Sequence, residues 1–380
     1  MKKLLIIADE NISGLEHFSE FAKIQKLPGR SISKDLLKNA DALLVRSVTA
    51  VNESLLEGSR VRFVGSTTSG YDHVDLEYLR QINIRFAYAP GSNANAVIQY
   101  VFASLAMLSE RFLFDWRQYG MGIIGGGHIG TLLAEFFQQL RMPFVIHDPY
   151  LDASYRFADR LVPLQEALQQ PMISLHTSLE KSGSFPSFHL LDANHLSIMN
   201  RASILINAAR GAVIENEALE EYLIGNSACR CVLDVWEHEP EISQSLLQRV
   251  CLGTPHIAGY SLEGKEQGSA AVHRALLNFF DLKEQPAFPL SEKKQTLSLP
   301  LPPETLAQVN QTILAAYNPA QDHDALLQGA AQSNVGMARA FDGLRKSYPL
   351  RREFTHFKLP AKLYSDEAVS VLSSLGFSYF

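Results

Sequence analysis

Short apolar runs alternate with longer amphipathic stretches along most of the chain. One series of apolar runs begins near residues 4, 41, 61 and 84, and a second begins near residues 121, 143, 171, 202 and 229. Short buried strands that alternate with helices are typical of βαβ units around a mostly parallel sheet. Because there are two such series, we predict an α/β fold with two doubly wound parallel-sheet domains.

The stretch between the two series is apolar over a greater length. Residues 93–110 read NANAVIQYVFASLAMLSE, which has the length and the Ala, Leu and Val content of a buried helix. We predict that this helix lies at the connection between the two domains.

A third unit is predicted after a proline-rich stretch. Five prolines fall within residues 286–304, which marks a domain boundary. The chain beyond it contains DHDALLQGAAQ, which has a helical pattern, and ends in DEAVSVLSSLGFSYF, which indicates a helix, a glycine turn and a strand. We therefore expect a small C-terminal αβ domain.

Composition excludes several classes of protein. The 380 residues are 46% hydrophobic and 19% charged, and 34 basic against 40 acidic residues leave a net charge of −6. This balance argues against a disordered chain and against a nucleic-acid partner. No apolar run approaches the roughly 18 residues that span a membrane. We expect a cytoplasmic protein with no membrane partner, and no metal site, since the three cysteines form no CxxC pair.

A glycine-rich loop follows the strand-like run near residue 121. Residues 125–130 read GGGHIG, so that Gly125, Gly127 and Gly130 have the spacing GxGxxG, and an amphipathic helical pattern follows. In this context the first glycine allows a tight turn, the second lets backbone amides approach a pyrophosphate, and the third permits close packing of helix on strand. His128 is either a solvent-facing residue or a pyrophosphate donor, and we include it with Ile129 in the predicted cofactor loop.

An acidic residue stands where the adenosine ribose is expected. Asp148 ends the next predicted strand beyond Gly130. A carboxylate here accepts hydrogen bonds from the ribose hydroxyls and repels a 2′-phosphate. We therefore predict NAD rather than NADP as the cofactor.

Three candidate catalytic residues stand at or just beyond apolar runs in the second series: Arg210, Glu239 and His256. Ligands of open α/β sheets bind at the carboxyl ends of parallel strands. Arg210 can hold a substrate carboxylate through a bidentate pair. His256 can remove a hydroxyl proton as hydride leaves, and Glu239 can hold one imidazole nitrogen. Together they supply what oxidation of a 2-hydroxy acid requires.

The motifs GGGHIG, HDP, SLHTS, LINAARGAVI, LDVWEHEP and TPHIAG resemble those of the D-isomer-specific 2-hydroxyacid dehydrogenase family. The resemblance covers essentially the whole chain. It implies a flavodoxin-like substrate domain formed by residues 1–95 with 256–285, and a Rossmann NAD-binding domain at residues 96–255. It also implies that residues 286–380 form a dimerisation domain, which predicts a homodimer.

The resemblance assigns further residues by position. It implies that Ser47, Thr68 and Tyr260 are substrate contacts. The cofactor neighbours that it implies, beside the glycine loop and Asp148, are Thr177, Ala208, Asp234 and Gly259. Ser and Thr also occur in such turns merely to satisfy the backbone, so this interpretation stays open for Ser47 and Thr68.

Four segments, LLVRSVTAVNESLL, FVGSTTSGYDHVD, PHIAGYSLEGK and FDGLRKSYPLRREF, are similar to one narrower branch of the family. That branch implies a small phosphorylated 2-hydroxy acid as substrate. Two alternatives stay open: a dehydrogenase of 3-phosphoglycerate or another D-2-hydroxy acid, and a binding protein that senses NADH. The basic cluster between Arg345 and Arg352 is interpreted as part of the dimerisation surface, with a contact to the substrate phosphate as the alternative.

Overall fold

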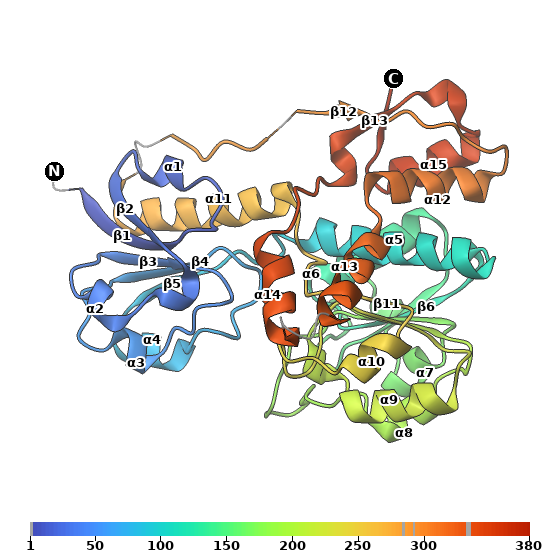
Figure 1. Cartoon of the computed structure of the whole chain (residues 1–380), viewed down its shortest axis with the longest axis horizontal. Helices are drawn as coiled ribbons and strands as arrows, with labels where there is room; N and C mark the ends of the chain where they lie inside the picture. The colour runs from blue at the N-terminus through green and yellow to red at the C-terminus, as the bar shows by residue number, and fades with distance from the viewer. Residues whose placement is uncertain (1–2, 283–285, 292, 332–335) are drawn as a thin grey trace. The chain divides into compact units, whose positions relative to one another are not determined.

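The computed structural model describes residues 3–282, 286–291, 293–331 and 336–380. By its contacts the chain divides into two compact units. The first combines Met1–Asn93 with Tyr260–Glu292, and the second combines Ala94–Gly259 with Lys293–Phe380. The predicted fold class is confirmed, because two parallel sheets are accompanied by a small C-terminal αβ part with its own sheet (Figure 1).

The sheet of the first unit has the order β2-β1-β3-β4-β5, which is the order of flavodoxin-like sheets. Its parallel strands are β1 (Leu4–Asp9), β2 (Ala22–Leu27), β3 (Ala42–Val45), β4 (Phe63–Ser66) and β5 (Arg85–Ala87). The apolar pattern does not predict β2. This edge strand fully buries only Ala22 and exposes Lys23 and Lys26, as suits a strand with one unpaired edge.

Helices cover both faces of this sheet, and they are α1 (Leu15–Phe18), α2 (Lys34–Leu37), α3 (Glu53–Leu56), α4 (Leu76–Gln81) and α11 (Leu262–Phe279). Successive residues of β1 point to opposite faces. Ile6 belongs to the apolar cluster that includes Val272 of α11, and Ile7 belongs to the cluster that includes Leu37 of α2. The segment after residue 260 therefore completes the core of the N-terminal sheet.

The second sheet has the order β11-β10-β9-β8-β6-β7 and is also parallel. Its strands are β6 (Met121–Ile124), β7 (Phe144–His147), β8 (Met172–Leu175), β9 (Ile204–Asn207), β10 (Arg230–Leu233) and β11 (Leu252–Gly253). A parallel bridge between Ile146 and Leu161 lies where the commonest Rossmann order has its third strand. The strand order reverses between β6 and β8.

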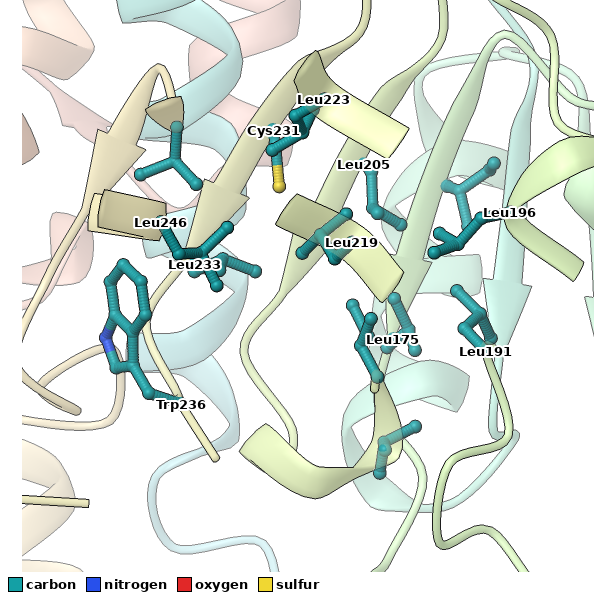
Figure 2. Close-up of a cluster of buried hydrophobic side chains, with 14 of the residues drawn as sticks. Leu175, Leu191, Leu196, Leu205, Leu219, Leu223, Cys231, Leu233, Trp236 and Leu246 are labelled. Atoms are coloured by element: carbon teal, nitrogen blue, oxygen red, sulfur yellow. The ribbon is translucent and has the colours of Figure 1, made fainter. Parts of the chain in front are cut away.

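The helices that accompany this sheet are α5 (Ala94–Phe112), α6 (His128–Gln139), α7 (Leu164–Leu168), α8 (Ala193–Ser197), α9 (Asn216–Gly225) and α10 (Gln244–Arg249). The predicted helix at residues 93–110 is confirmed by α5, which is buried over most of its length. On one face of the sheet, Leu205 and Leu233 from neighbouring strands lie beside Leu219 of α9 (Figure 2). This apolar core packs the helices on that face against β8, β9 and β10.

The C-terminal part contains α12 (Thr305–Ala316), α13 (Pro319–Ala331), α14 (Met337–Lys346), α15 (Asp366–Ser374), β12 (Gln295–Thr296), β13 (Phe357–Leu359) and β14 (Ser378–Tyr379). The predicted final helix, glycine turn and strand are α15, Gly376 with a φ of +102°, and β14. The predicted helix DHDALLQGAAQ lies in α13, except that residue 332 lies outside the described residues. Single 3₁₀ turns occur at Gly29–Ser31, Trp116–Gln118, Ala158–Arg160, Gly211–Val213, Phe354–His356 and Ala361–Leu363.

This C-terminal part shares its core with the six-stranded sheet. Leu326 of α13 and Phe341 of α14 are fully buried in the same apolar cluster as Leu205. Trp116 Nε1 also donates to Asn310 Oδ1 of α12 at 3.0 Å. The division into residues 1–95 with 256–285, 96–255 and 286–380 stays a proposal, in which the third part is packed on the second. Within the described ranges, no helix is both long enough and apolar enough to cross a membrane.

Candidate active site and cofactor site

The predicted cofactor residues lie at the carboxyl ends of strands in the six-stranded sheet. Because the strands are parallel, these ends share one edge, and ligands bind at that edge where the strand order reverses. Four of them directly follow a strand: Gly125 follows β6, Asp148 follows β7, Ala208 follows β9 and Asp234 follows β10. Thr177 is the second residue after β8, and Gly259 is the sixth after β11. The fold therefore gathers them on one side of one sheet.

The glycine loop has the geometry that its spacing predicts. Gly125 has a φ of +98°, a conformation that residues with a side chain rarely adopt. A Cβ on Gly130 would lie 1.9 Å from the carbonyl oxygen of Gly125, so only glycine lets α6 begin this close to the strand. A Cβ on Gly127 would meet nothing within 4 Å among the described residues, which leaves the N-terminus of α6 open.

The acid and the loop are joined directly. Asp148 Oδ2 accepts the N–H of Gly126 at 2.9 Å, and Oδ1 accepts the N–H of Tyr150 at 3.0 Å. His128 is exposed and begins α6, and Ile129 follows it. The backbone amides at the open N-terminus of α6 suit a pyrophosphate. The Asp148 carboxylate, which two backbone N–H groups hold after the neighbouring strand β7, suits the ribose of a dinucleotide.

His256 and Glu239 form a close pair. His256 Nδ1 lies 2.7 Å from Glu239 Oε2, and Glu239 Oε1 accepts the N–H of Trp236 at 2.9 Å. A carboxylate only accepts, so Nδ1 carries the proton and Nε2 is the nitrogen that can exchange a proton with a substrate. The side chain of His256 is 33% exposed, which leaves the ring accessible.

Charge stabilises this pair. Burial opposes ionisation of Glu239, but the charge and the hydrogen bond of His256 outweigh burial and lower the pKa of the Glu239 carboxyl below its ordinary value. The carboxylate is therefore ionised at neutral pH and holds the imidazole in one orientation.

The backbone of His256 is held in an uncommon conformation. Its φ is +57°, a value rarely found outside glycine. Its N–H donates to the carbonyl oxygen of Asp234 at 2.7 Å. Non-glycine residues in this region persist only where their surroundings hold them, and they often occur at active sites.

Asp234 holds the loop that carries His256. Its Oδ1 accepts from Thr254 Oγ1 at 2.7 Å and from the N–H of Ile257 at 2.8 Å, and its Oδ2 accepts from the N–H of Ala258 at 2.9 Å. The side chain is buried, and burial raises the pKa of the Asp234 carboxyl above its ordinary value. Its predicted place beside the cofactor stays a prediction, but these bonds add a positioning role that the sequence does not reveal.

Arg210 stands in the loop after β9. Asn207 Nδ2 donates to the carbonyl oxygen of Arg210 at 3.0 Å. The guanidinium Nη1 of Arg210 donates to Ala209 O at 2.8 Å. A Cβ on Gly211 would lie 1.9 Å from the carbonyl oxygen of Trp236. The loop of Arg210 therefore lies against the segment that leads to Glu239, and the structure brings the two loops of the catalytic prediction together.

The predicted substrate contacts belong to the first unit. Ser47 is exposed after β3, and Thr68 and Tyr260 are half-buried. Thr68 Oγ1 donates to Gly70 O at 2.9 Å and also contacts Ser66 Oγ at 2.7 Å. The hydroxyl of Thr68 is therefore engaged in its own turn, as the backbone-satisfying interpretation expects.

Arg351 is a further residue of the site that sequence reasoning missed. It is 6% exposed, and its guanidinium donates to Ala258 O at 3.0 Å and to Ala96 O at 2.5 Å. It also lies 3.8 Å from the centroid of the Tyr317 ring. Arg351 belongs neither to an exposed dimerisation surface nor to a contact with the substrate phosphate, the two interpretations of the basic cluster. Its side chain is buried and links the C-terminal part to the loop of His256 through Ala258 O. Arg345, Lys346 and Arg352 in the same stretch are also basic, so the sequence does not single out Arg351.

Replacing Arg351 by methionine is expected to lower the free energy of unfolding by about 3 kcal/mol, because each buried carbonyl left without a donor costs about 1–3 kcal/mol. Chemical denaturation measures this value. Lys358→Met, which removes an exposed cation of β13, serves as the matched control and should change little. A loss below about 1 kcal/mol for Arg351→Met, within the usual range for surface substitutions, would contradict the positioning role.

Comparison with known families finds two matches. Residues 107–258 match the family described as D-isomer specific 2-hydroxyacid dehydrogenase, NAD binding domain. Residues 292–376 match a family described only as a domain of unknown function. The first match covers the region that contains the glycine loop, Asp148 and His256.

Full-length relatives are similar to the whole chain. An erythronate-4-phosphate dehydrogenase of Marinobacter nauticus is 40% identical over 381 residues, covering 98% of this chain and 99% of the relative. The enzyme of the same description from Cellvibrio japonicus is 41% identical over 382 residues, again with 98% and 99% coverage.

Solved structures show the same fold at lower identity. The D-lactate dehydrogenase from Aquifex aeolicus, complexed with NAD and lactic acid, is 21% identical with a TM-score of 0.62, covering 74% of this chain and 97% of that one. The 3-phosphoglycerate dehydrogenase of Entamoeba histolytica, bound to NAD⁺, is 19% identical with a TM-score of 0.63, covering 76% and 99%. At this identity the likeness concerns the fold alone.

Proposed function

Because the chain belongs to the erythronate-4-phosphate dehydrogenases within the D-isomer-specific 2-hydroxyacid dehydrogenase family, we propose that it oxidises 4-phospho-D-erythronate with NAD. The product is (R)-3-hydroxy-2-oxo-4-phosphooxybutanoate, an intermediate of pyridoxal 5′-phosphate biosynthesis. Identity of 40% over nearly the full length of both chains is the observation that carries this proposal.

The chain's own residues have separate roles in the proposed reaction. Arg210 holds the substrate carboxylate and so orients the 2-hydroxyl. His256 accepts the hydroxyl proton at Nε2, while Glu239 holds the ring through Nδ1 at 2.7 Å. Bound NAD supplies the hydride acceptor. Asp234 and Arg351 keep the loop of His256 in place through their bonds to its backbone.

A turnover experiment tests the function. Purified protein with NAD and 4-phospho-D-erythronate should produce NADH and a 2-oxo acid that a hydrazine reagent traps. D-Erythronate and 3-phosphoglycerate, assayed in parallel, test the alternative substrates. If NADH binds but no hydroxy acid is oxidised, the proposal fails in favour of a protein that senses NADH.

Asp148 is proposed to bind the adenosine ribose. Replacing it by serine should raise the Kd for NADH about tenfold, because a hydrogen bond to a charged group contributes about 1.5–3 kcal/mol. The same variant should bind NADPH more tightly than the wild type, since the repelling charge is gone. Fluorescence titration measures both constants. Asp159→Ser removes an exposed acid of the same region and should leave both unchanged.

We further propose that the protein is a cytoplasmic homodimer assembled through its C-terminal part. Three large apolar side chains of this part are exposed in the single chain: Leu350, Leu363 and Phe380. Exposed apolar side chains of this kind are suited to an interface between subunits. Light scattering should give twice the 42.3 kDa of one chain. A monomer at micromolar concentration would refute the dimer, and cell fractionation tests the location.

A further inference from the structure

In the first unit, the side chains of Arg46 and Lys265 both lie close to the ring of Tyr260. Arg46 directly follows β3, and its Nη2 donates to the hydroxyl of Tyr260 at 3.1 Å. The Arg46 guanidinium lies 5.8 Å from the centroid of the Tyr260 ring, and Lys265 Nζ lies 4.8 Å from the same centroid. Lys265 is on the first turn of α11. The end of β3 and the start of α11 thus form one basic site.

Neither cation is neutralised. Among the described residues, no carboxylate forms an ion pair with Arg46 or Lys265, although many surface cations of this chain have one. Burial, together with the nearby charge of Arg46, lowers the pKa of the Lys265 ammonium to about 8. Two like charges in a partly buried place repel each other, and an anion bound between them would remove that repulsion.

The position of Lys265 is set by tight packing of α11. A Cβ on Gly268 would lie 2.4 Å from the carbonyl oxygen of Thr67, and one on Gly264 would lie 3.1 Å from that of Ser92. Ser261 Oγ caps the helix by accepting the N–H of Gly264 at 2.9 Å. The start of α11 therefore lies directly against the turn after β4, and Lys265 is placed at the carboxyl ends of β3 and β4.

We propose that Lys265, Arg46 and Tyr260 form the subsite that binds the phosphate group of the substrate. This inference rests on the proposed function, and it names the residues that distinguish a phosphorylated from an unphosphorylated hydroxy acid. Two cations match the double charge of a phosphate, and Arg presents several donors in a fixed plane.

The test compares two substrates that differ only in the phosphate. The ratio of kcat/KM for 4-phospho-D-erythronate to kcat/KM for D-erythronate should fall about tenfold to a hundredfold in Lys265→Gln, the range expected for one charge-assisted hydrogen bond. Arg46→Gln should lower the ratio by a similar factor, and Lys265→Arg should restore most of it. Activity on D-erythronate should stay close to that of the wild type. Lys23→Gln, on the exposed side of β2, is the matched control.

The result that would overturn the subsite is an equal change for both substrates, or no change, in Lys265→Gln and Arg46→Gln. The activity of each variant on D-erythronate also shows that it is folded. If the wild type oxidises no hydroxy acid, the proposed function fails, and calorimetric titration with inorganic phosphate decides the subsite by itself. Weaker phosphate binding by Lys265→Gln would then support it, and unchanged binding would overturn it.

Discussion

Replacing His256 by glutamine is expected to lower kcat by about 10²- to 10⁴-fold, the usual contribution of a positioned general base. Glutamine occupies a similar volume but cannot take up the hydroxyl proton at Nε2. The variant should still bind NADH, since the glycine loop and Asp148 follow β6 and β7, whereas His256 follows β11. Stopped-flow or steady-state measurement of NADH formation gives kcat, and fluorescence titration gives cofactor binding.

Two variants frame this result. His195→Gln changes a histidine of α8 whose Nδ1 lies 2.8 Å from Asp192 Oδ1, and it should keep nearly full activity. Glu239→Gln leaves the imidazole without the carboxylate at 2.7 Å and should lower kcat less than loss of the ring itself. If His256→Gln kept kcat within tenfold of the wild type, another group would have to accept the proton.

Replacing Arg210 by glutamine should lower kcat/KM by about 10²- to 10³-fold, because truncating one partner of a buried charge pair costs about 2–5 kcal/mol. Arg210→Lys should recover only part of this loss, since an ammonium cannot form the bidentate pair with a carboxylate. Steady-state kinetics with 4-phospho-D-erythronate measures both. Arg201→Gln, an exposed cation just before β9, should leave kcat/KM unchanged. An unchanged KM and kcat in Arg210→Gln would remove Arg210 from the site.

The central strands could be predicted because they are buried on both faces. The runs that become β1, β3, β6 and β9 are almost wholly apolar, which is typical of strands inside parallel sheets. The pattern does not predict β2 or the short β11. An edge strand such as β2 has one unpaired edge and needs few apolar residues, so its sequence lacks the continuous apolar run that marks a central strand.

The chemistry of the cofactor loop could be predicted for a similar reason. Gly125 is needed for its positive φ, and Gly130 is needed because α6 begins so close to the strand. Because both needs arise within one short loop, they appear in the sequence as glycines at a fixed spacing. Asp148 comes after the glycine loop at the separation that α6 and β7, which lie between them, require. The roles of Arg210, Glu239 and His256 came from motifs and from their place after strands, and the contact of Glu239 with His256 agrees with that expectation.

The sequence by itself determined the α/β class, the glycine loop, the choice of NAD and the family to which the chain belongs, because each depends on residues close together along the chain. Only the tertiary structure decided that Asp234 and Arg351 support the loop of His256, and that Arg46 and Lys265 share Tyr260. Arg351 and Ala258 are 93 positions apart, and Arg46 and Tyr260 are 214 apart. No periodicity links residues at such distances, and only the packing of the folded chain brings their charges and carbonyls together.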